Sequence, residues 1–116
     1  RGGLDAFRKL GFQPKEIRLI GGGSKSPIWR QIAADIMNLP IRVPLLDEAA
    51  ALGGAVQALW CLKNQSGKCD IAQLCAEHIK LDESKSTNPI AENVAAYDKA
   101  YAEYDKIVNT LTPLYE

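Results

Sequence analysis

The chain has 116 residues, of which 47% are hydrophobic and 24% charged, a composition typical of a globular protein rather than a disordered one. Its 14 basic and 14 acidic side chains give zero net charge at pH 7, which argues against nucleic acid or an anionic membrane as a partner. No apolar run approaches the roughly 20 residues of a transmembrane helix, and the first residues lack the apolar stretch of a signal peptide.

The first predicted element is a helix over residues 4–10. Leu4, Phe7 and Leu10 recur at helical spacing, and Gly11 follows them as the kind of residue that commonly ends a helix. A short apolar run over residues 16–20 then stops at three glycines. A short apolar run bounded by turn residues is typical of a buried strand.

The next predicted element is a helix over residues 27–37. Ser26 is a favourable N-cap, Pro27 suits the first helical position, and residues 38–40 carry the signals that end a helix. Apolar residues at steps of three and four predict a single buried face. This predicted apolar face consists of Ile28, Trp29, Ile32, Ala33, Ile36 and Met37.

A second short strand is predicted over residues 41–43, followed by a helix over residues 49–60 that Asp47 or Glu48 can cap. The helix is apolar almost all round, so we expect it to be deeply buried. Its pair Gly53–Gly54 costs up to about 1 kcal/mol per glycine relative to alanine. We therefore expect another backbone or a ligand to approach closely there.

The alternation of helices and strands predicts an α/β fold with a parallel sheet covered on both faces. Two short strands are too few for a complete sheet, which usually has about five. The chain also begins with Arg1 rather than methionine. Both observations predict that the chain is part of a longer protein.

The last part of the chain predicts a short helix over residues 71–79, a polar connection over 80–89 and a long amphipathic helix. We expect the aromatic stripe of the long helix to pack on the body of the protein, because coiled-coil pairing needs more repeats. The stripe follows steps of three and four residues through Val94, Tyr97, Tyr101, Tyr104, Val108 and Leu111.

The spacing of Cys61, Cys69 and Cys75 fits neither a disulfide framework nor a zinc ribbon. Free thiols indicate a reducing, cytoplasmic setting and a structural or incidental role for these residues. His78 is the single histidine, and its neighbour Glu77 is expected to point elsewhere. We therefore predict no metal site.

The most informative feature is the glycine-rich turn Gly21–Gly23 between a predicted strand and a capped helix. Glycines let a ligand approach the backbone, and a helix start favours phosphate or polar nucleotide atoms. A P-loop would need glycine in place of Leu19 and Ser24, and the dinucleotide motif and the nucleophile elbow would need glycine in place of Ser26. From these residues alone, a tight turn without a ligand is an equally good interpretation.

Residues 16–36 resemble the nucleotide-binding signature of the FGGY carbohydrate kinases. Residues 48–55 and the ending from Asn88–Pro89 onward are similar to the same family, and the similarity is weakest over residues 64–86. The resemblance implies the C-terminal part of an actin-like (ribonuclease H-like) ATPase domain, with parallel strands alternating with helices and a long C-terminal helix. Residues 1–116 would then be part of the C-terminal nucleotide-binding domain of a two-domain sugar kinase.

The activity implied by the resemblance is ATP- and Mg²⁺-dependent phosphorylation of a ketopentose, because residues 25–31 are most similar to members that act on D-xylulose. The resemblance implies that the catalytic base and the sugar site would belong to an N-terminal domain that this chain does not include, so this piece is expected to be inactive alone. We therefore assign no catalytic residue, and neither Asp35, Asp47 nor Glu48 is taken as the base. The partners implied are ATP and a small sugar, and a homodimer is left open.

The nucleotide contacts implied by the family's motif fall on Gly21, Gly22, Gly23 and Ser26. Related kinases often carry asparagine at the position of Ser26, so its polar contact is expected to differ or to run through water. Ser24 and Lys25 are weaker candidates, because their side chains are expected to face solvent. The alternatives are an FGGY kinase for another sugar or polyol, a non-catalytic actin-like module, and a stand-alone nucleotide-binding module.

Overall fold

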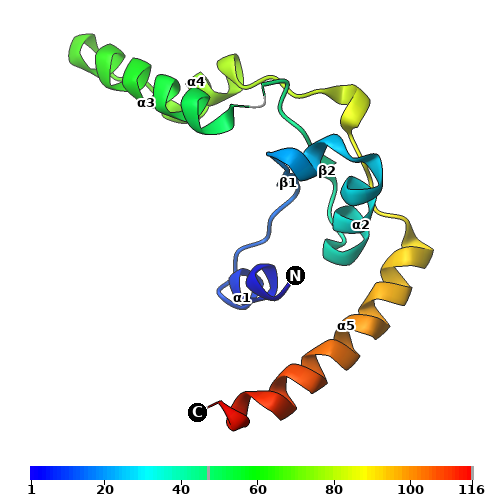
Figure 1. The fold of residues 1–116 in the computed structure, drawn as a ribbon. Coiled ribbons are helices and arrows are strands. Elements are labelled where there is room, and N and C mark those ends of the chain that lie inside the picture. The colour runs from blue at the N-terminus through cyan, green and yellow to red at the C-terminus, as the bar shows by residue number, and fades with distance from the viewer. Residues whose placement is uncertain (47, 116) are drawn as a thin grey trace.

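The computed structural model describes residues 1–46 and 48–115 (Figure 1). The predicted cap at Asp47 therefore lies outside the described residues, and Glu48 precedes the third helix without a side-chain cap bond. The elements follow in the order α1 (Gly2–Lys9), β1 (Ile17–Arg18), η1 (Gly22–Lys25), α2 (Pro27–Met37), β2 (Ile41–Arg42), α3 (Ala49–Ser66), α4 (Ile71–His78), η2 (Glu83–Lys85), α5 (Ala91–Leu111) and η3 (Thr112–Leu114), where η marks a 3₁₀ helix.

The described chain is extended. Its radius of gyration is 18.1 Å, whereas a compact domain of this length has about 13 Å. In Figure 1, α3 and α4 project away from the sheet at one end, and α5 runs away from it at the other. No described helix combines the length and the apolar character needed to cross a membrane.

The two predicted strands form a parallel pair, as expected. Ile17 pairs with Ile41, and Arg18 pairs with Arg42. The polar connection adds an antiparallel bridge on the other edge of β2, where the Ile41 amide donates to the Thr87 carbonyl at 2.8 Å and the Thr87 amide donates back at 3.0 Å. β2 is therefore held on both edges.

The buried core lies where β2 meets α2. It consists of Ala34, Ile41 and Val43, with Ile17, Leu19 and Ala33 packed against it. The prediction that the strand at residues 16–20 is buried is wrong for the described chain, since Ile17 and Leu19 are half-buried and Ile20 is exposed. The physical reason is that β1 has one strand neighbour among the described residues.

The end of α1 confirms the role predicted for Gly11, which adopts a φ of +87°. The Gly11 amide donates to the Arg8 carbonyl at 3.0 Å, and the Phe12 amide donates to the Phe7 carbonyl at 3.1 Å. These two bonds define a Schellman motif, in which the residues flanking the turn usually touch. The rings of Phe7 and Phe12 meet edge to face, with centroids 6.2 Å apart.

Replacing Gly11 with alanine is expected to destabilise α1 by about 1–2 kcal/mol, because an L side chain is strained at positive φ. Gly3→Ala is the matched control, since Gly3 lies inside α1 and a Cβ there meets no described atom within 4 Å. The control should stabilise the helix by up to about 1 kcal/mol. Hydrogen exchange of the α1 amides measures both changes, and equal effects of the two variants would contradict the prediction.

The predicted boundaries of α2 are confirmed. Ser26 Oγ accepts a hydrogen bond from the Trp29 amide at 3.2 Å, and Pro27 is the first helical residue. Asn38 ends the helix in the left-handed conformation, with φ of 49°. These are short-range capping preferences that a sequence displays directly.

The predicted apolar face of α2 is wrong in part. The buried residues are Arg30, Ala34 and Asp35, whereas Ile28 is 73% exposed and Trp29 is also exposed. The reason is that α2 packs against η1 and β2 on one side and against α5 on another. Two polar side chains are therefore enclosed at these contacts.

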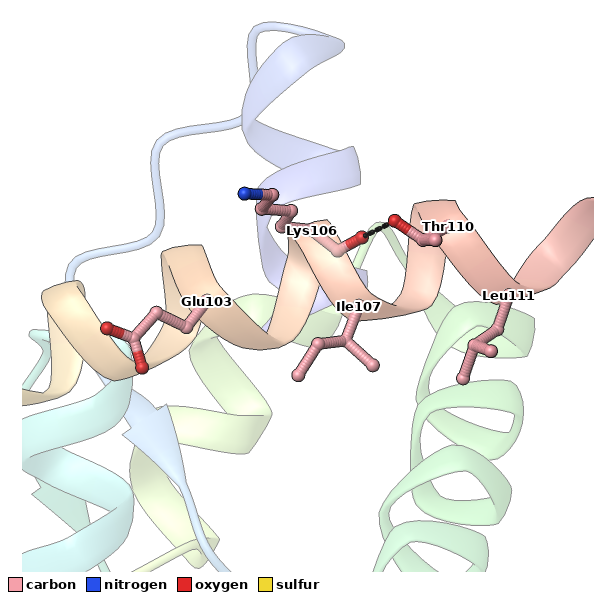
Figure 2. Close-up of a pocket in the computed structure, with 5 residues that line it drawn as sticks. All are labelled: Glu103, Lys106, Ile107, Thr110 and Leu111. Carbon is pink, nitrogen blue, oxygen red and sulfur yellow. Dashed lines mark hydrogen bonds between the residues drawn. The ribbon is translucent and has the colours of Figure 1, made fainter.

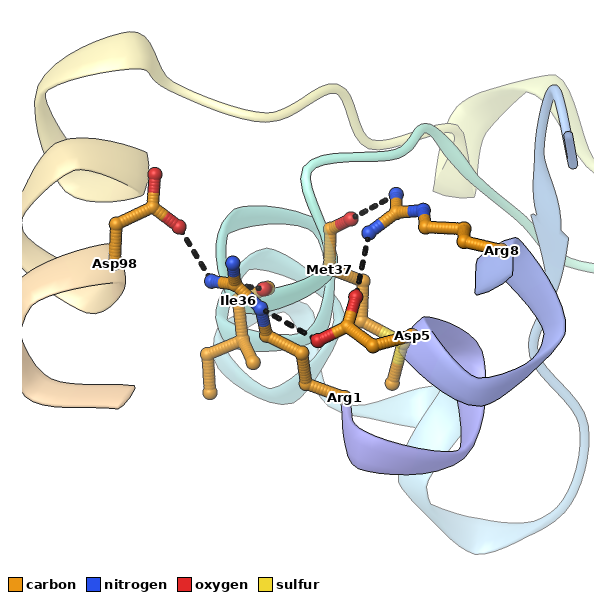
Figure 3. Close-up of polar contacts among 6 residues, drawn as sticks. All are labelled: Arg1, Asp5, Arg8, Ile36, Met37 and Asp98. Atoms are coloured by element: carbon orange, nitrogen blue, oxygen red, sulfur yellow. Dashed lines mark hydrogen bonds and ion pairs between the residues drawn. The ribbon is translucent and has the colours of Figure 1, made fainter. Parts of the chain in front are cut away.

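The carboxyl end of α2 is held by two arginines of the α1 segment (Figure 3). Arg1 Nη1 donates to the Ile36 carbonyl at 3.4 Å, and Arg8 Nη2 donates to the Met37 carbonyl at 3.1 Å. Asp5 lies between both guanidinium groups, 3.5 Å from Arg1 Nε and 3.1 Å from Arg8 Nη1. The arginines thus bond carbonyls that have no intrahelical partner, at the negative end of the helix dipole.

The prediction that the helix after the second strand is deeply buried is wrong for the described chain. Among the residues of α3 only Val56 is buried. α4 covers one side of α3, where Trp60 Nε1 donates to the Cys69 carbonyl at 2.8 Å. No described atom lies within 4 Å of a Cβ built on Gly53 or Gly54, so the close approach expected there is made by no described residue.

The tyrosine stripe of α5 packs on the body of the protein over its first half only. Val94 is buried, Tyr97 and Tyr101 are half-buried, and Tyr104 is 61% exposed. Arg1 lies over the Tyr101 ring, 4.6 Å from its centroid, and pairs with Asp98. The second half of α5 is uncovered by the described chain.

Candidate functional site

The glycine-rich turn lies between β1 and α2 (Figure 1). Gly21 adopts φ of 80°, a conformation that favours glycine, and the following residues wind into η1. The Ser24 amide and hydroxyl both donate to the Gly21 carbonyl, at 3.1 and 2.7 Å. The turn is therefore a defined structure rather than a loose loop.

The neighbouring glycines of the turn have different surroundings. A Cβ built on Gly22 meets no described atom within 4 Å, whereas one on Gly23 would lie 2.8 Å from Cδ1 of the Trp29 ring. Gly22 therefore exposes its backbone to open space, where a ligand can approach it closely. Gly23 instead makes room for Trp29.

Ser24 corrects one prediction from the sequence. Ser24 is 2% exposed, and its hydroxyl is occupied by the bond to the Gly21 carbonyl. The expectation that its side chain faces solvent is therefore wrong. Lys25, for which the same was predicted, is exposed. Ser24 is thus a structural member of the turn.

Ser26 is exposed at the start of α2. Its oxygen accepts the capping bond from Trp29, and its hydroxyl proton is not used in that bond. The residue stays a predicted nucleotide contact, at the helix end whose dipole favours negative charge.

Arg30, which was not among the residues predicted to form the site, lies behind the turn. Its side chain is 8% exposed, and Nη1 donates to the Ser24 carbonyl at 2.7 Å. The sequence could have pointed to Arg30 through its position four residues after the cap Ser26, since residues four apart lie one above the other on a helix.

Asp35 has a structural role, in agreement with its exclusion as a catalytic base. It is 1% exposed, and Gln31 Nε2, the Ile90 amide and Asn93 Nδ2 each donate to its carboxylate at 2.8 Å. Burial alone would raise the pKa of Asp35, but the bonds from Ile90, Asn93 and Gln31 outweigh it and hold the pKa below its usual value. The ionised carboxylate joins α2 to the start of α5.

Metal binding finds no support in the part of the chain that the structure describes. No group of three or more histidine, cysteine, aspartate or glutamate side chains is placed to hold an ion there. We therefore assign the Mg²⁺ that the resemblance implies to no described residue of this chain.

Two hollows away from the turn offer little chemistry. One, of about 420 Å³, follows the outer face of α5, where Ile107 and Leu111 point to one side and Thr110 bonds the Lys106 carbonyl at 2.8 Å (Figure 2). The other, of about 440 Å³, lies between α2 and α5 and is lined by Asp35, whose carboxylate already accepts hydrogen bonds from Gln31 and Asn93. Neither hollow combines an open backbone with the start of a helix, as the glycine-rich turn does.

The sequence pattern of the FGGY family of carbohydrate kinases, C-terminal domain, matches residues 1–62. The chain therefore belongs to the FGGY family of carbohydrate kinases. The fold class predicted from the resemblance, the C-terminal part of an actin-like ATPase domain, is confirmed by the structural neighbours, which are FGGY sugar kinases.

Individual relatives are sugar kinases. The chain is 45% identical over 104 residues to the xylulose kinase of Haemophilus influenzae, which covers 90% of this chain and 20% of that protein. It is 31% identical over 105 residues to the ribulokinase of Bacillus licheniformis, covering 90% and 19%. The crystal structure of ligand-bound xylulose kinase from Lactobacillus acidophilus superposes with a TM-score of 0.74 at 26% identity, over 87% of this chain and 19% of that one. The chain thus spans about a fifth of the length of these relatives.

Proposed function

We propose that the protein carrying this chain is an ATP-dependent kinase that converts D-xylulose to D-xylulose 5-phosphate. The observation that carries the proposal is the 45% identity to a xylulose kinase, which extends over 90% of the chain. The geometry of the turn supports it, because Gly22 leaves room for a ligand against the backbone.

The role proposed for this chain is to bind and orient the nucleotide. Gly21, Gly22 and Gly23 form the proposed nucleotide-binding turn, in which Gly22 would let the nucleotide lie against the backbone and Gly23 makes room for Trp29. The Ser26 hydroxyl at the start of α2 would give the nucleotide a polar contact. Phosphoryl transfer relies chiefly on positioning and on stabilisation of charge. A turn that is internally bonded suits positioning, because it loses little freedom when the ligand binds.

The base that accepts the proton of the sugar hydroxyl, and the sugar site itself, are proposed to belong to the rest of the polypeptide. This proposal is supported by the extended shape, the two-stranded sheet and the exposed faces of α3 and α5. Each of these features leaves surface that the rest of the polypeptide would cover. A cytoplasmic location is proposed as well, since Cys61, Cys69 and Cys75 are free thiols.

A kinase for another sugar is the second candidate function. The 31% identity to a ribulokinase over 90% of the chain favours it. Sugar specificity is proposed to depend on residues outside this chain, so the two candidates share the same nucleotide site.

The full-length protein is expected to phosphorylate D-xylulose with a kcat/KM at least about tenfold above that for D-ribulose or xylitol, a margin of about 1.4 kcal/mol. The 116-residue chain alone is expected to show no activity, because it has no assigned base. A coupled assay of ADP release over the sugar panel measures both. Preference for another sugar would favour the second candidate, and activity of the chain alone would refute the division of roles.

A further inference from the structure

We propose that Arg30 is the positioning residue of the glycine-rich turn, holding it in the shape that receives the nucleotide. The inference rests on the proposed function, because it takes the turn to be the nucleotide site. Arg30 is buried, and its Nη1 donates to the Ser24 carbonyl at 2.7 Å. It comes from the second turn of α2, so it ties the turn to the helix that follows it.

Ser24 is the residue through which this tie acts. Its amide and hydroxyl hold the Gly21 carbonyl, and its own carbonyl is held by Arg30. A carbonyl near the end of a short helix lacks an intrahelical donor, and a cation is favourable at that end. The Arg30 guanidinium thus fixes one side of the turn, while Gly22 remains open on its surface.

Packing alone does not account for an arginine here. Its Nε is buried without a hydrogen-bond partner, and no described carboxylate forms a salt bridge with it. Burying a guanidinium without an ion pair is costly, and a well-packed apolar side chain often stabilises a buried position equally well or better. The feature that an apolar side chain cannot supply is the hydrogen bond to Ser24.

Other contacts at this junction do not depend on the Arg30 side chain. The Arg30 amide donates to the Ser26 carbonyl at 3.0 Å, and the Trp29 amide donates to Ser26 Oγ. Both bonds persist in any variant at position 30 that keeps the helix. Removing the guanidinium should therefore loosen the turn without unwinding α2.

The test compares Arg30→Met with Arg30→Lys in the full-length kinase, and Arg42→Met is the matched control. Arg42 is a half-buried arginine on β2 whose Nη1 donates to the Ile41 carbonyl at 3.1 Å. Arg30→Met is expected to raise the KM for ATP about tenfold, with kcat and the KM for sugar within about twofold of wild type. Arg30→Lys keeps a cationic donor, so it should bring the ATP KM back to within about threefold. The control should leave all three constants within about twofold.

A second readout is hydrogen exchange of residues 19–26 without nucleotide, which should be faster in Arg30→Met and unchanged in the control. If Arg30→Met fails to fold, Arg30→Gln takes its place, because it also removes the guanidinium, and the same two results are expected of it. A wild-type ATP KM in Arg30→Met, or a parallel rise of its ATP and sugar KM values, would overturn the role of Arg30.

Gly22→Val, measured alongside, distinguishes a failure of the role of Arg30 from a failure of the proposed nucleotide site. If it also leaves the ATP KM unchanged, the proposed nucleotide site itself fails. If it raises the ATP KM while Arg30→Met does not, only the role of Arg30 fails.

Discussion

Replacing Gly22 with valine in the full-length protein, assayed for the proposed kinase activity, is expected to raise the KM for ATP by about tenfold or more, with the KM for sugar near its wild-type value. A Cβ at this position meets no described atom within 4 Å, and the backbone there has no positive φ. The added side chain is therefore tolerated by the described chain itself. It would project into the space that the proposed function gives to the nucleotide, and its cost falls on ligand binding.

Two further variants make this result interpretable. Gly67→Val is the matched control, because Gly67 is extended, with φ of 166°, and also has open space around its Cβ. Gly23→Ala is the structural comparison, since its Cβ would force the Trp29 ring to move. Initial rates at varied ATP and sugar measure all three. An unchanged ATP KM in Gly22→Val would count against the assignment of the turn to the nucleotide.

The local elements around this turn could be predicted because their signals are short-range. Gly11, Pro27 and Asn38 mark helix ends through the backbone conformations that they favour, and the structure places each at the predicted end. The parallel pairing of the strands followed from the helix that connects them. None of these predictions depends on what surrounds the chain.

Burial could not be predicted in the same way, because it depends on which surfaces meet. α3 is apolar almost all round over residues 49–60 yet mostly exposed here, and α2 encloses Arg30 and Asp35 while Ile28 is exposed. A hydrophobic pattern reports burial in a complete protein, and this chain spans about a fifth of the length of the relatives it matches. Arg30 lies within the family-like run of residues 25–31, but its role comes from a contact with a backbone carbonyl, which no motif displays.

Replacing Asp35 with alanine is expected to destabilise the contact between α2 and α5 by about 2–4 kcal/mol. The change removes an enclosed carboxylate and leaves the Ile90 amide and Asn93 Nδ2 without their acceptor. Gln31 Nε2 also loses its bond to Asp35 but keeps a second acceptor, the Asn88 carbonyl at 3.1 Å. Each unsatisfied buried donor costs about 1–3 kcal/mol, although part of the cost is recovered where water reaches the group. Asp35→Asn should cost less, because Asn93 can rotate its amide and accept the new donor.

The pH dependence of this effect has a definite sign. The folded-state pKa of Asp35 lies below its usual value, so the stabilisation is fully present above the unfolded pKa of about 3.9 and is lost as the pH falls through the folded value. The difference in opening free energy between wild type and Asp35→Ala should therefore be constant near pH 7 and shrink below pH of about 4. Hydrogen exchange of residues 88–97 in the full-length protein reports this opening directly, since the Ile90 amide is itself a partner of Asp35.

The matched control for Asp35 is Asp105→Ala, at an exposed aspartate of α5 that accepts a bond from Asn109 at 3.2 Å. An exposed substitution of this kind should change the opening free energy by no more than about 0.5 kcal/mol. Equal exchange in the two variants, or an Asp35 effect that persists unchanged at low pH, would contradict the role of the ionised carboxylate. A large effect confined to Asp35 would instead establish that one enclosed charge, accepting three hydrogen bonds, holds the helix that follows the glycine-rich turn against α5.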